Sequence, residues 1–522
     1  MSNKYIGITV GPIVETLLLT TKPAGLWGAS YIFSYFSKTL IENLIESKNV
    51  KKEDFIIPLW TDEISKKVKE SQVGLLHDRI IFRTNKNTDL SIVEKTINKT
   101  KEDVAKVIIR AFDNCNCSRE KTDVEEYIKK YIRTHTVCIE GEIENDDNVI
   151  LKIGKYLSSL ELENTFIEKE WMNYILKFLE NRSSMESGKS DGTNDILKNS
   201  DLTNFKDGWY FENENGIVSI DDISGINNKG DNKNNTDGYF ALVQMDGDSL
   251  GKILGTLDEN KLKDFSKNCF DYADKASSII NEYGGKVIYA GGDDILFLAP
   301  LISNNSNQHL FSLIEKISKN FNEIFDYTNV TLSAGIFICY YKYPLCEGLK
   351  SVFNLLNKSK EDGKCRTTIQ LEQHSKSMGT LQLKTSFEDA DIFKLFIKWL
   401  NDVNSKNENK DDLLRSIQRK ISIYETLFLK ALESEKREEK LNILFKNLFE
   451  EIENNQKEDN GISVTNIDLK NAISFLVKSY KHKEDNKIKN ISKQVLDELN
   501  ALISILKFYV REKKQIKAEE GK

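Results

Sequence analysis

The same order of apolar runs and amphipathic segments occurs twice in the sequence, in about 1–145 and in about 239–385. In each stretch a strand-like run is followed by a helical apolar stripe, two short strand-like runs, a second helical stripe and a last strand-like run. In the second stretch these segments are 239–245, 262–283, 286–290, 295–298, 310–325 and 330–341. This β-α-β-β-α-β order is that of the ferredoxin-like fold. The sequence therefore predicts an α+β protein that contains two such domains.

The rest of the sequence divides into two further blocks. Residues 146–238 begin with a helical pattern and continue into stretches rich in Ser, Gly, Asp and Asn, which are too polar to bury. We expect a helical and linker region with flexible loops at 183–199 and 227–237. Residues 386–522 carry no strand pattern and are rich in Leu, Ile, Lys and Glu, which predicts a C-terminal helical domain.

The composition excludes several classes of protein. The chain has 522 residues, of which 39% are hydrophobic and 30% charged, as in a globular protein. Its 74 Lys and Arg against 81 Asp and Glu give a net charge of −7, which argues against a general nucleic-acid coat. We expect no membrane span, because no apolar run reaches the required length of about 18 residues. Seven cysteines, an odd number, favour free thiols and a cytoplasmic location.

Three carboxylates are expected to converge at one edge of the second domain. Asp246 ends the first strand-like run, whereas Asp293 and Asp294 lie at the tip of the hairpin formed by the next two runs. Carboxylates held together repel one another unless cations neutralise them, and Mg²⁺ or Mn²⁺ prefers such oxygen ligands. Two such ions about 4 Å apart can activate a 3′-hydroxyl and stabilise a leaving pyrophosphate. A lone Gly-Gly-Asp-Asp turn is more often a polar loop, but two motifs at the strand ends of one unit favour a two-metal site.

The surroundings of these carboxylates point to phosphate binding. Glycines on both sides would let a triphosphate approach the backbone N–H groups closely. Lys360, near the end of a helical segment over 345–361, would offset phosphate charge. Asp248 has two interpretations, because it can help to hold metal or can cap the helix that begins at about 249.

Three motifs together resemble a known family. They are the Gly-Gly-Asp-Asp hairpin at 291–294, the preceding Met-Asp-Gly-Asp-Ser-Leu-Gly at 245–251, and an opening Gly-Pro at 11–12 followed by Leu-Trp-Gly-Ala-Ser-Tyr at 26–31. In these motifs the chain resembles the large Cas-ten subunit of type III CRISPR complexes, and its opening motif resembles the Cmr (type III-B) branch.

The resemblance implies a fold, an activity and a set of site residues. Two palm domains would face each other and bind two nucleotides, and the second would join ATP units through 3′–5′ bonds when the complex holds target RNA. The first palm would be degenerate, because its first strand ends in Val-Gly-Pro without a carboxylate. The metal ligands implied are Asp246, Asp293 and Asp294, and the implied nucleotide-binding residues are Gly247, Asp248, Ser249, Gly291, Gly292 and Lys360.

The resemblance also implies partners and leaves the product open. The partners would be other Cmr-type subunits, crRNA and target RNA, and residues 386–522 are the expected docking surface. We expect no HD nuclease, because the first palm begins within a few residues of Met1 and the His77-Asp78 pair runs into a strand-like segment. Related chains without that nuclease make cyclic oligoadenylate or join AMP to S-adenosylmethionine, and the sequence does not separate these two products.

Three other interpretations are weaker. A scaffold that binds crRNA with a silent site would have no need to keep three carboxylates together. A free-standing diguanylate cyclase would carry Glu after Gly-Gly-Asp, and this chain does not. A zinc site at Cys115 and Cys117, with His135 and Cys138, lacks the paired C-x-x-C spacing, so we expect free thiols there.

Overall fold

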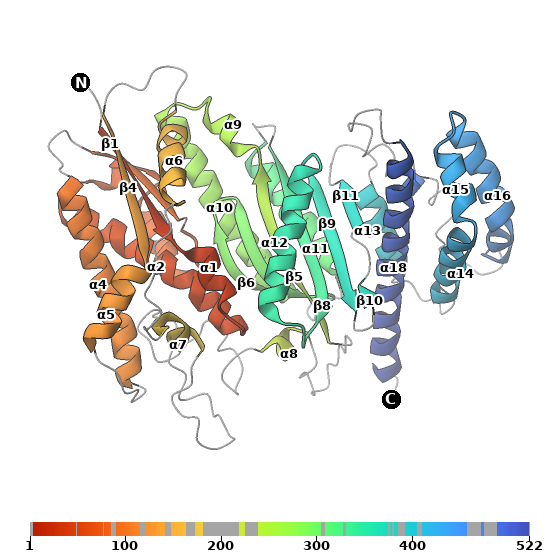
Figure 1. The fold of residues 1–522 in the computed structure, drawn as a ribbon, viewed down its shortest axis with the longest axis horizontal. Coiled ribbons are helices and arrows are strands. Elements are labelled where there is room, and N and C mark those ends of the chain that lie inside the picture. The colour runs from red at the N-terminus through yellow and green to blue at the C-terminus, as the bar shows by residue number, and fades with distance from the viewer. Residues whose placement is uncertain are drawn as a thin grey trace.

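The structure is a computed structural model of the whole chain. It describes residues 4–48, 50–71, 73–76, 78–84, 90–114, 121–140, 148–162, 173–180, 219–224, 238–303, 308–326, 330–373, 376–377, 381–384, 392–403, 410–456, 471–473 and 488–520. The loops expected at 183–199 and 227–237 lie outside these residues. The described part forms three bodies in a row, with the N-terminal sheet at one end and the C-terminal helices at the other (Figure 1).

The first sheet has four antiparallel strands in the order β2-β3-β1-β4. They are β1 (Lys4–Gly11), β2 (Phe55–Ile57), β3 (Arg79–Thr84) and β4 (Arg133–Glu140). The central strand β1 is buried along six consecutive residues, because helices cover both faces of the sheet. This is the strand order of the ferredoxin-like fold, so the first β-α-β-β-α-β prediction is confirmed.

The helices of the first body place one element against the second sheet. They are α1 (Ile13–Leu18), α2 (Pro23–Glu46), α3 (Asp62–Glu70), α4 (Leu90–Asn114) and α5 (Lys121–Tyr131), with a 3₁₀ turn η1 (Lys52–Asp54). Helix α2 packs on α4 on one side and on strand β6 of the second sheet on the other. It is buried along most of its length, which explains its run of Trp, Tyr and Phe residues.

The second sheet repeats the same strand order and extends it. Strands β5 (Tyr239–Asp248), β6 (Lys286–Gly291), β7 (Asp294–Pro300) and β8 (Thr331–Tyr340) run in the order β8-β5-β7-β6. Beyond β8 lie β9 (Arg366–Gln373), which is parallel to β8, and then β10 (Lys376–Ser377) and β11 (Leu381–Lys384), which both pair with β9. The sequence did not predict these last three strands, because the polar residues of β9 lack a clean period of two.

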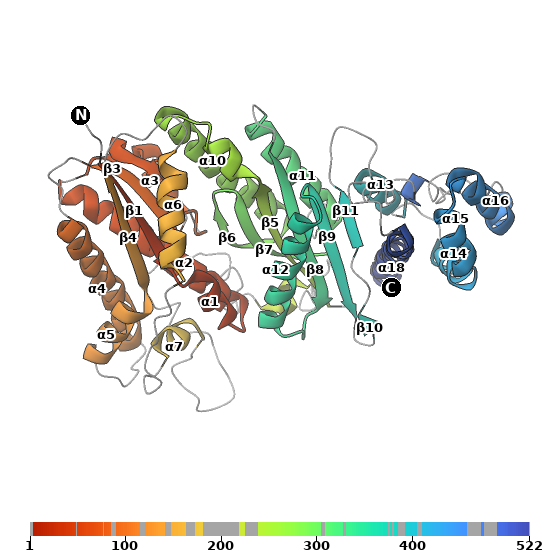
Figure 2. The ribbon, with the colours of Figure 1, turned by 45° about the horizontal axis from the view of Figure 1, so that its top comes forward.

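Different helices cover the two faces of the second sheet. Helices α10 (Glu259–Tyr283) and α11 (Leu310–Ile324) pack together through ring contacts, with Tyr272 and Phe321 centred 5.0 Å apart. Helix α12 (Leu345–Glu361) lies across the other face (Figure 2). That face carries Leu242, Gln244 and Asp246 of β5, because alternate residues of a strand point to the same side. The charged end of β5 therefore lies beside the end of α12.

The two sheets are joined through a direct interface. Ser266 on α10 accepts the backbone N–H of Leu59 at 2.9 Å, and the backbone N–H of Ala290 donates to the carbonyl of Gly74 at 3.1 Å. A small apolar cluster with members on both sides supports these bonds, and it consists of Tyr5, Ile56, Ile81, Val149, Ile153, Leu157 and Leu262. The connecting region contributes α6 (Val149–Leu160), α7 (Tyr174–Glu180) and α8 (Ile220–Ile223), and α9 (Leu250–Leu254) follows β5.

The C-terminal helices pack on the far edge of the second sheet. They are α13 (Ile392–Val403), α14 (Lys410–Ile423), α15 (Glu425–Leu432), α16 (Arg437–Gln456) and α18 (Ile488–Glu520). Phe508 of α18 meets Tyr239 of β5 with ring centroids 4.9 Å apart, and α18 also lies along β11. The α+β fold class is confirmed, whereas the expected domain limits at 145, 238 and 385 stay predictions. Among the described residues, no helix is both long and apolar enough to span a membrane.

The buried ring cluster between α10 and α11 gives a stability prediction. Phe321 is fully buried and contacts the rings of Tyr272 and Phe325, so Phe321→Ala would leave a cavity. We expect a loss of about 3–5 kcal/mol in the free energy of unfolding, measured by urea denaturation. The control is Ile443→Ala at a 54% exposed position, and an equal loss in both variants would contradict the packing argument.

Candidate nucleotide-binding site

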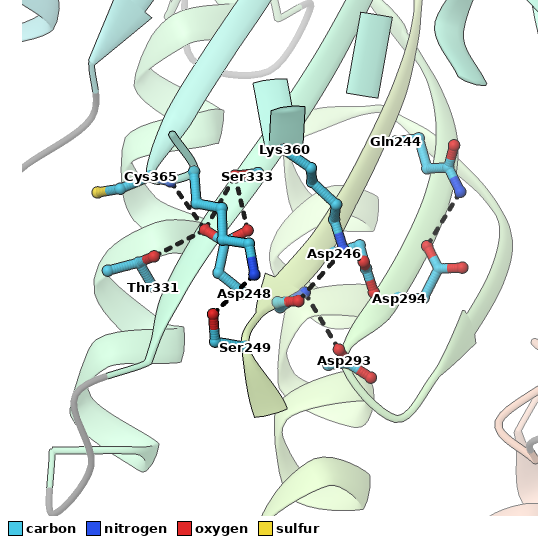
Figure 3. Close-up of polar contacts among 12 residues, drawn as sticks. Gln244, Asp246, Asp248, Ser249, Asp293, Asp294, Thr331, Ser333, Lys360 and Cys365 are labelled. Carbon is cyan, nitrogen blue, oxygen red and sulfur yellow. Dashed lines mark hydrogen bonds and ion pairs between the residues drawn. The ribbon is translucent and has the colours of Figure 1, made fainter. Parts of the chain in front are cut away.

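The end of β5 touches the tip of the β6–β7 hairpin. The backbone N–H of Gly247 donates to Asp293 Oδ2 at 3.1 Å. A Cβ atom at position 247 would lie 2.7 Å from that same oxygen, so only glycine allows the approach. The hairpin turns at Gly292 with a φ of 68°, a left-handed value that favours glycine. Asp246 precedes Gly247 in the chain, and Asp293 accepts the backbone N–H of Gly247. The two aspartates that the sequence predicted to converge therefore both adjoin this residue (Figure 3).

Lys360 is the cation of this site. Its Nζ forms an ion pair with Asp246 Oδ2 and also donates to the carbonyl oxygen of Gly247 at 3.3 Å. Burial and the neighbouring Lys364 ammonium lower the pKa of Lys360 to about 8. The ion pair with Asp246 favours the charged form and acts against this shift. The ammonium is thus bound by one carboxylate oxygen and one carbonyl oxygen.

Asp294 belongs to a different set of contacts. It accepts a hydrogen bond from the Tyr289 hydroxyl at 2.7 Å and one from Gln244 Nε2 at 3.2 Å. Burial raises the pKa of Asp294 to about 7, with a further contribution from the charge of Asp293, while these two donors act to lower it. The carboxyl group is directed to the Gln244 side of the hairpin rather than towards Asp246 (Figure 3).

Asp248 is buried and faces strand β8. Its oxygens accept hydrogen bonds from Thr331 Oγ1 at 2.7 Å, from Ser333 Oγ at 2.9 Å and from the backbone N–H of Cys365 at 2.8 Å. The side chain therefore ties β5 to β8 and to the loop after α12 rather than capping α9. Ser249, the next residue, accepts a hydrogen bond from Lys364 Nζ at 2.7 Å.

A cavity of about 190 Å³ lies between the first body and the hairpin. It is lined by Ile13, Val14, Leu17, Ser30, Phe33, Ser34, Gly74, Leu76, Asp78, Tyr289, Gly291 and Asp294. None of these described lining residues is Lys or Arg, so the cavity is apolar and acidic.

The residues present can be tested as metal ligands. Within the described residues, no group of three or more His, Cys, Asp and Glu side chains is placed to hold a metal ion. Asp246, Asp293 and the carbonyl of Gly247 nevertheless offer the hard oxygen donors that Mg²⁺ and Mn²⁺ prefer, and Lys360 already brings a positive charge to them. This donor set fits a divalent ion at Asp246 and Asp293, and the role of Asp294 as a ligand stays a prediction.

The structure adds residues that the sequence did not single out. Asp78, considered only as part of an HD motif, lines the cavity together with Ser30 and Ser34 of α2. Lys364, four residues after Lys360, contacts Ser249. No local pattern could have found these residues, because chain segments distant in sequence bring them together. Cys115 and Cys117 of the considered zinc site lie outside the described residues, and Cys138 is a free thiol.

The strand order and the Gly-Gly-Asp-Asp hairpin are those of a palm domain, and comparisons with known proteins agree. Residues 239–368 match the family described as Cas10/Cmr2, second palm domain. The CRISPR system Cmr subunit Cmr2 of Pyrococcus furiosus is 27% identical over 165 residues, which cover 26% of this chain and 18% of that subunit. The matched part thus spans less than a fifth of the relative's length.

Two solved structures extend the likeness in fold to most of the chain. A type III-B Cmr-beta structure in the apo state matches with a TM-score of 0.56 and 11% identity, covering 84% of this chain and 77% of that chain. A Csm1–Csm4 cassette in complex with cA4 matches with a TM-score of 0.51 and 13% identity, covering 95% and 70%. Residues 239–368 are a Cas10/Cmr2 second palm domain, and the resemblance of the chain to the large subunit of that family is confirmed.

The raised pKa of Asp294 gives a pH prediction for the metal-free protein. Asp294 stays protonated up to about pH 7 in the folded chain, but only up to about pH 4 in the unfolded chain. The free energy of unfolding therefore falls as the pH rises between these two values. Asp294→Asn removes this dependence. Between pH 5 and pH 8, the free energy of unfolding of the variant should rise by about 2–3 kcal/mol relative to that of the unmodified chain. Urea denaturation in EDTA measures this difference. The control is Asp326→Asn at an exposed position, and equal profiles for the two variants would contradict the assignment.

Proposed function

We propose that the chain is the metal-dependent nucleotidyltransferase subunit of an RNA-guided type III CRISPR complex. In this proposal it makes cyclic oligoadenylate from ATP when the complex binds target RNA. The observation that carries the proposal is the meeting of Asp246 and Asp293 at Gly247, inside the segment that matches the Cas10/Cmr2 second palm domain. The likeness in fold to a Csm1–Csm4 cassette that holds cA4 supports this choice of product.

The reaction assigns a role to each part of the site. The 3′-oxygen of one nucleotide attacks the α-phosphorus of an ATP, the new P–O bond forms, and the bond to the leaving pyrophosphate breaks. Lys360 and Lys364, at the end of α12 and just beyond it, would bind the triphosphate and balance its charge. Asp294, on the wall of the neighbouring cavity, would accept the proton of the attacking hydroxyl.

The bound metal would complete this arrangement. Asp246, Asp293 and the carbonyl of Gly247 would hold Mg²⁺ or Mn²⁺, with Lys360 moving from Asp246 to the phosphates. The ion would supply Lewis-acid stabilisation of the charge that develops on the phosphate oxygens. Gly247, Gly291 and Gly292 would keep the backbone open to the nucleotide at this edge.

Removal of the two convergent carboxylates tests the proposal. Asp246→Ala and Asp293→Ala should each lower pyrophosphate release from ATP by at least about 100-fold, because neither variant can hold the metal. The measurement uses the assembled complex with target RNA, ATP and Mg²⁺ or Mn²⁺, and native binding of RNA should be unchanged. The matched control is Asp326→Ala, and full activity in either site variant would refute the site assignment.

A second candidate product has an observation in its favour. The cavity beside Asp294 also contains Asp78 and carries no basic lining residue among those described. Two carboxylates attract a cationic or donor-rich group and repel phosphate. S-adenosylmethionine carries a sulfonium and an ammonium charge, so it is a chemically suitable acceptor for AMP in this cavity, with pyrophosphate again leaving.

Asp78 separates the two products. Asp78→Asn removes one negative charge from the cavity but keeps its volume. If S-adenosylmethionine is the acceptor, the variant should lose at least about tenfold in its conversion, because an ion pair with a half-buried carboxylate is broken. Oligoadenylate formed from ATP alone should change much less. Mass spectrometry of products made with and without S-adenosylmethionine measures both, and equal losses would remove the case for a cationic acceptor.

The partners belong to the same proposal. Other Cmr-type subunits, crRNA and target RNA would contact this chain, with the C-terminal helices as a docking surface. The exposed apolar side chains of Ile423, Leu427 and Ile443 on α14, α15 and α16 suit such a role. Truncation at residue 386 is an unsuitable test, because Phe508 and Tyr509 of α18 pack on the second palm and its removal would uncover the core.

A further inference from the structure

Four consecutive residues at the end of β5 contact the end of α12 and the loop that follows it. Asp246 and the carbonyl of Gly247 bind Lys360, Asp248 accepts the backbone N–H of Cys365, and Ser249 accepts Lys364 Nζ. Figure 3 shows these contacts side by side. Both lysines that the proposed reaction uses are therefore held by the end of β5 and the residue that follows it. Lys360 belongs to the last turn of α12, whereas the placement of Lys364 depends on the path of the loop at 362–365.

The backbone of this loop is in an unfavourable conformation. Gly363, Lys364 and Cys365 have φ values of 116°, 64° and 50°, and the last two are not glycine. Left-handed conformations at such residues persist only when the surrounding structure enforces them. Within the loop itself, the amide of Lys364 donates to the carbonyl of Ser359 at 3.1 Å. The amide of Cys365 donates instead to Asp248, which belongs to a different part of the chain.

Asp248 is built as a rigid acceptor for this amide. Its residue is only 2% exposed, and the hydroxyls of Thr331 and Ser333 on β8 hold its carboxylate in place. With three donors on its two oxygens, the carboxylate is committed to protein groups.

We propose that Asp248 is a positioning residue that holds the 362–365 loop, and with it Lys364, in the geometry that receives the triphosphate. This inference deepens the proposed function and rests on it. Asp248 acts through the backbone of Cys365 and touches neither the nucleotide nor the metal. Because Lys364 and Cys365 are left-handed, loss of this acceptor would make the loop conformation more costly to hold.

Hydrogen exchange tests the structural half of the proposal without using activity. In Asp248→Ala the amide of Cys365 loses its acceptor, so peptides that cover 362–367 should exchange at least about tenfold faster in the full chain. Ser333→Ala removes one of the side chains that fix Asp248 and should give a smaller increase. Exchange in α10 serves as the internal control for general unfolding. Unchanged exchange at 362–367 in Asp248→Ala would overturn the proposal.

A comparison of two substitutions separates positioning from metal binding. Asp248→Asn keeps an oxygen for the Cys365 amide, and the Thr331 and Ser333 hydroxyls can donate or accept as needed. It should retain activity within about fivefold of the unmodified chain, whereas Asp248→Ala should lose about 100-fold because Lys364 is misplaced. The loss should combine a higher KM for ATP with a lower kcat. The Mn²⁺ concentration for half-maximal activity should stay the same in both variants.

A metal ligand would behave differently. Asn would then be as damaging as Ala, and the half-maximal Mn²⁺ concentration would rise in both variants, which would overturn the positioning role. Failure of the underlying function is recognised separately. If Asp246→Ala and Asp293→Ala keep full pyrophosphate release, the enzymatic proposal is wrong whatever the exchange at 362–367 shows.

Discussion

The contact between Gly247 and Asp293 is the constraint on which the site depends. It joins the end of β5 to the tip of the β6–β7 hairpin through one hydrogen bond of 3.1 Å, in a space that no side chain at position 247 could share. The contact places Asp293 against the residue that follows Asp246, so two aspartates adjoin the end of β5. Lys360 neutralises the negative charge of Asp246 in this structure. In the proposed reaction a divalent ion would do so instead.

The first palm contributes to the site without carboxylates on its first strand. Helix α2 packs directly on β6, and the segment at 73–78 bonds to the backbone of the same strand. One wall of the cavity therefore comes from the first palm and the other from the Gly-Gly-Asp-Asp hairpin. The proposed roles, a catalytic second palm and a first palm that only shapes the acceptor space, are consistent with two copies of one fold whose sequences differ so much. The identity of the acceptor then depends on residues such as Asp78.

Much of the fold follows from local patterns, and the exceptions have physical reasons. The two β-α-β-β-α-β units were predictable because each strand and helix has a clear period and the hairpin has characteristic turn residues. Strand β9 was missed because it lies beside the parallel edge of β8 with polar residues that show no clean alternation. The role of Asp248 was ambiguous from sequence, because an aspartate before a helix usually caps that helix. In the structure its carboxylate instead accepts hydrogen bonds from Thr331 of β8 and from the backbone N–H of Cys365.

The sequence alone specifies the strand order, the turn at 291–294 and the presence of carboxylates at two strand ends, because these depend on neighbours in the chain. The tertiary structure decides which carboxylate faces which partner. Asp246 and Asp293 flank Gly247, Asp294 turns to Tyr289 and Gln244, and Asp248 holds a distant loop. It also decides that α2 and Asp78 close a cavity over the hairpin. These features depend on how two domains and a helix end pack, and such long-range contacts leave no periodic signal in a single sequence.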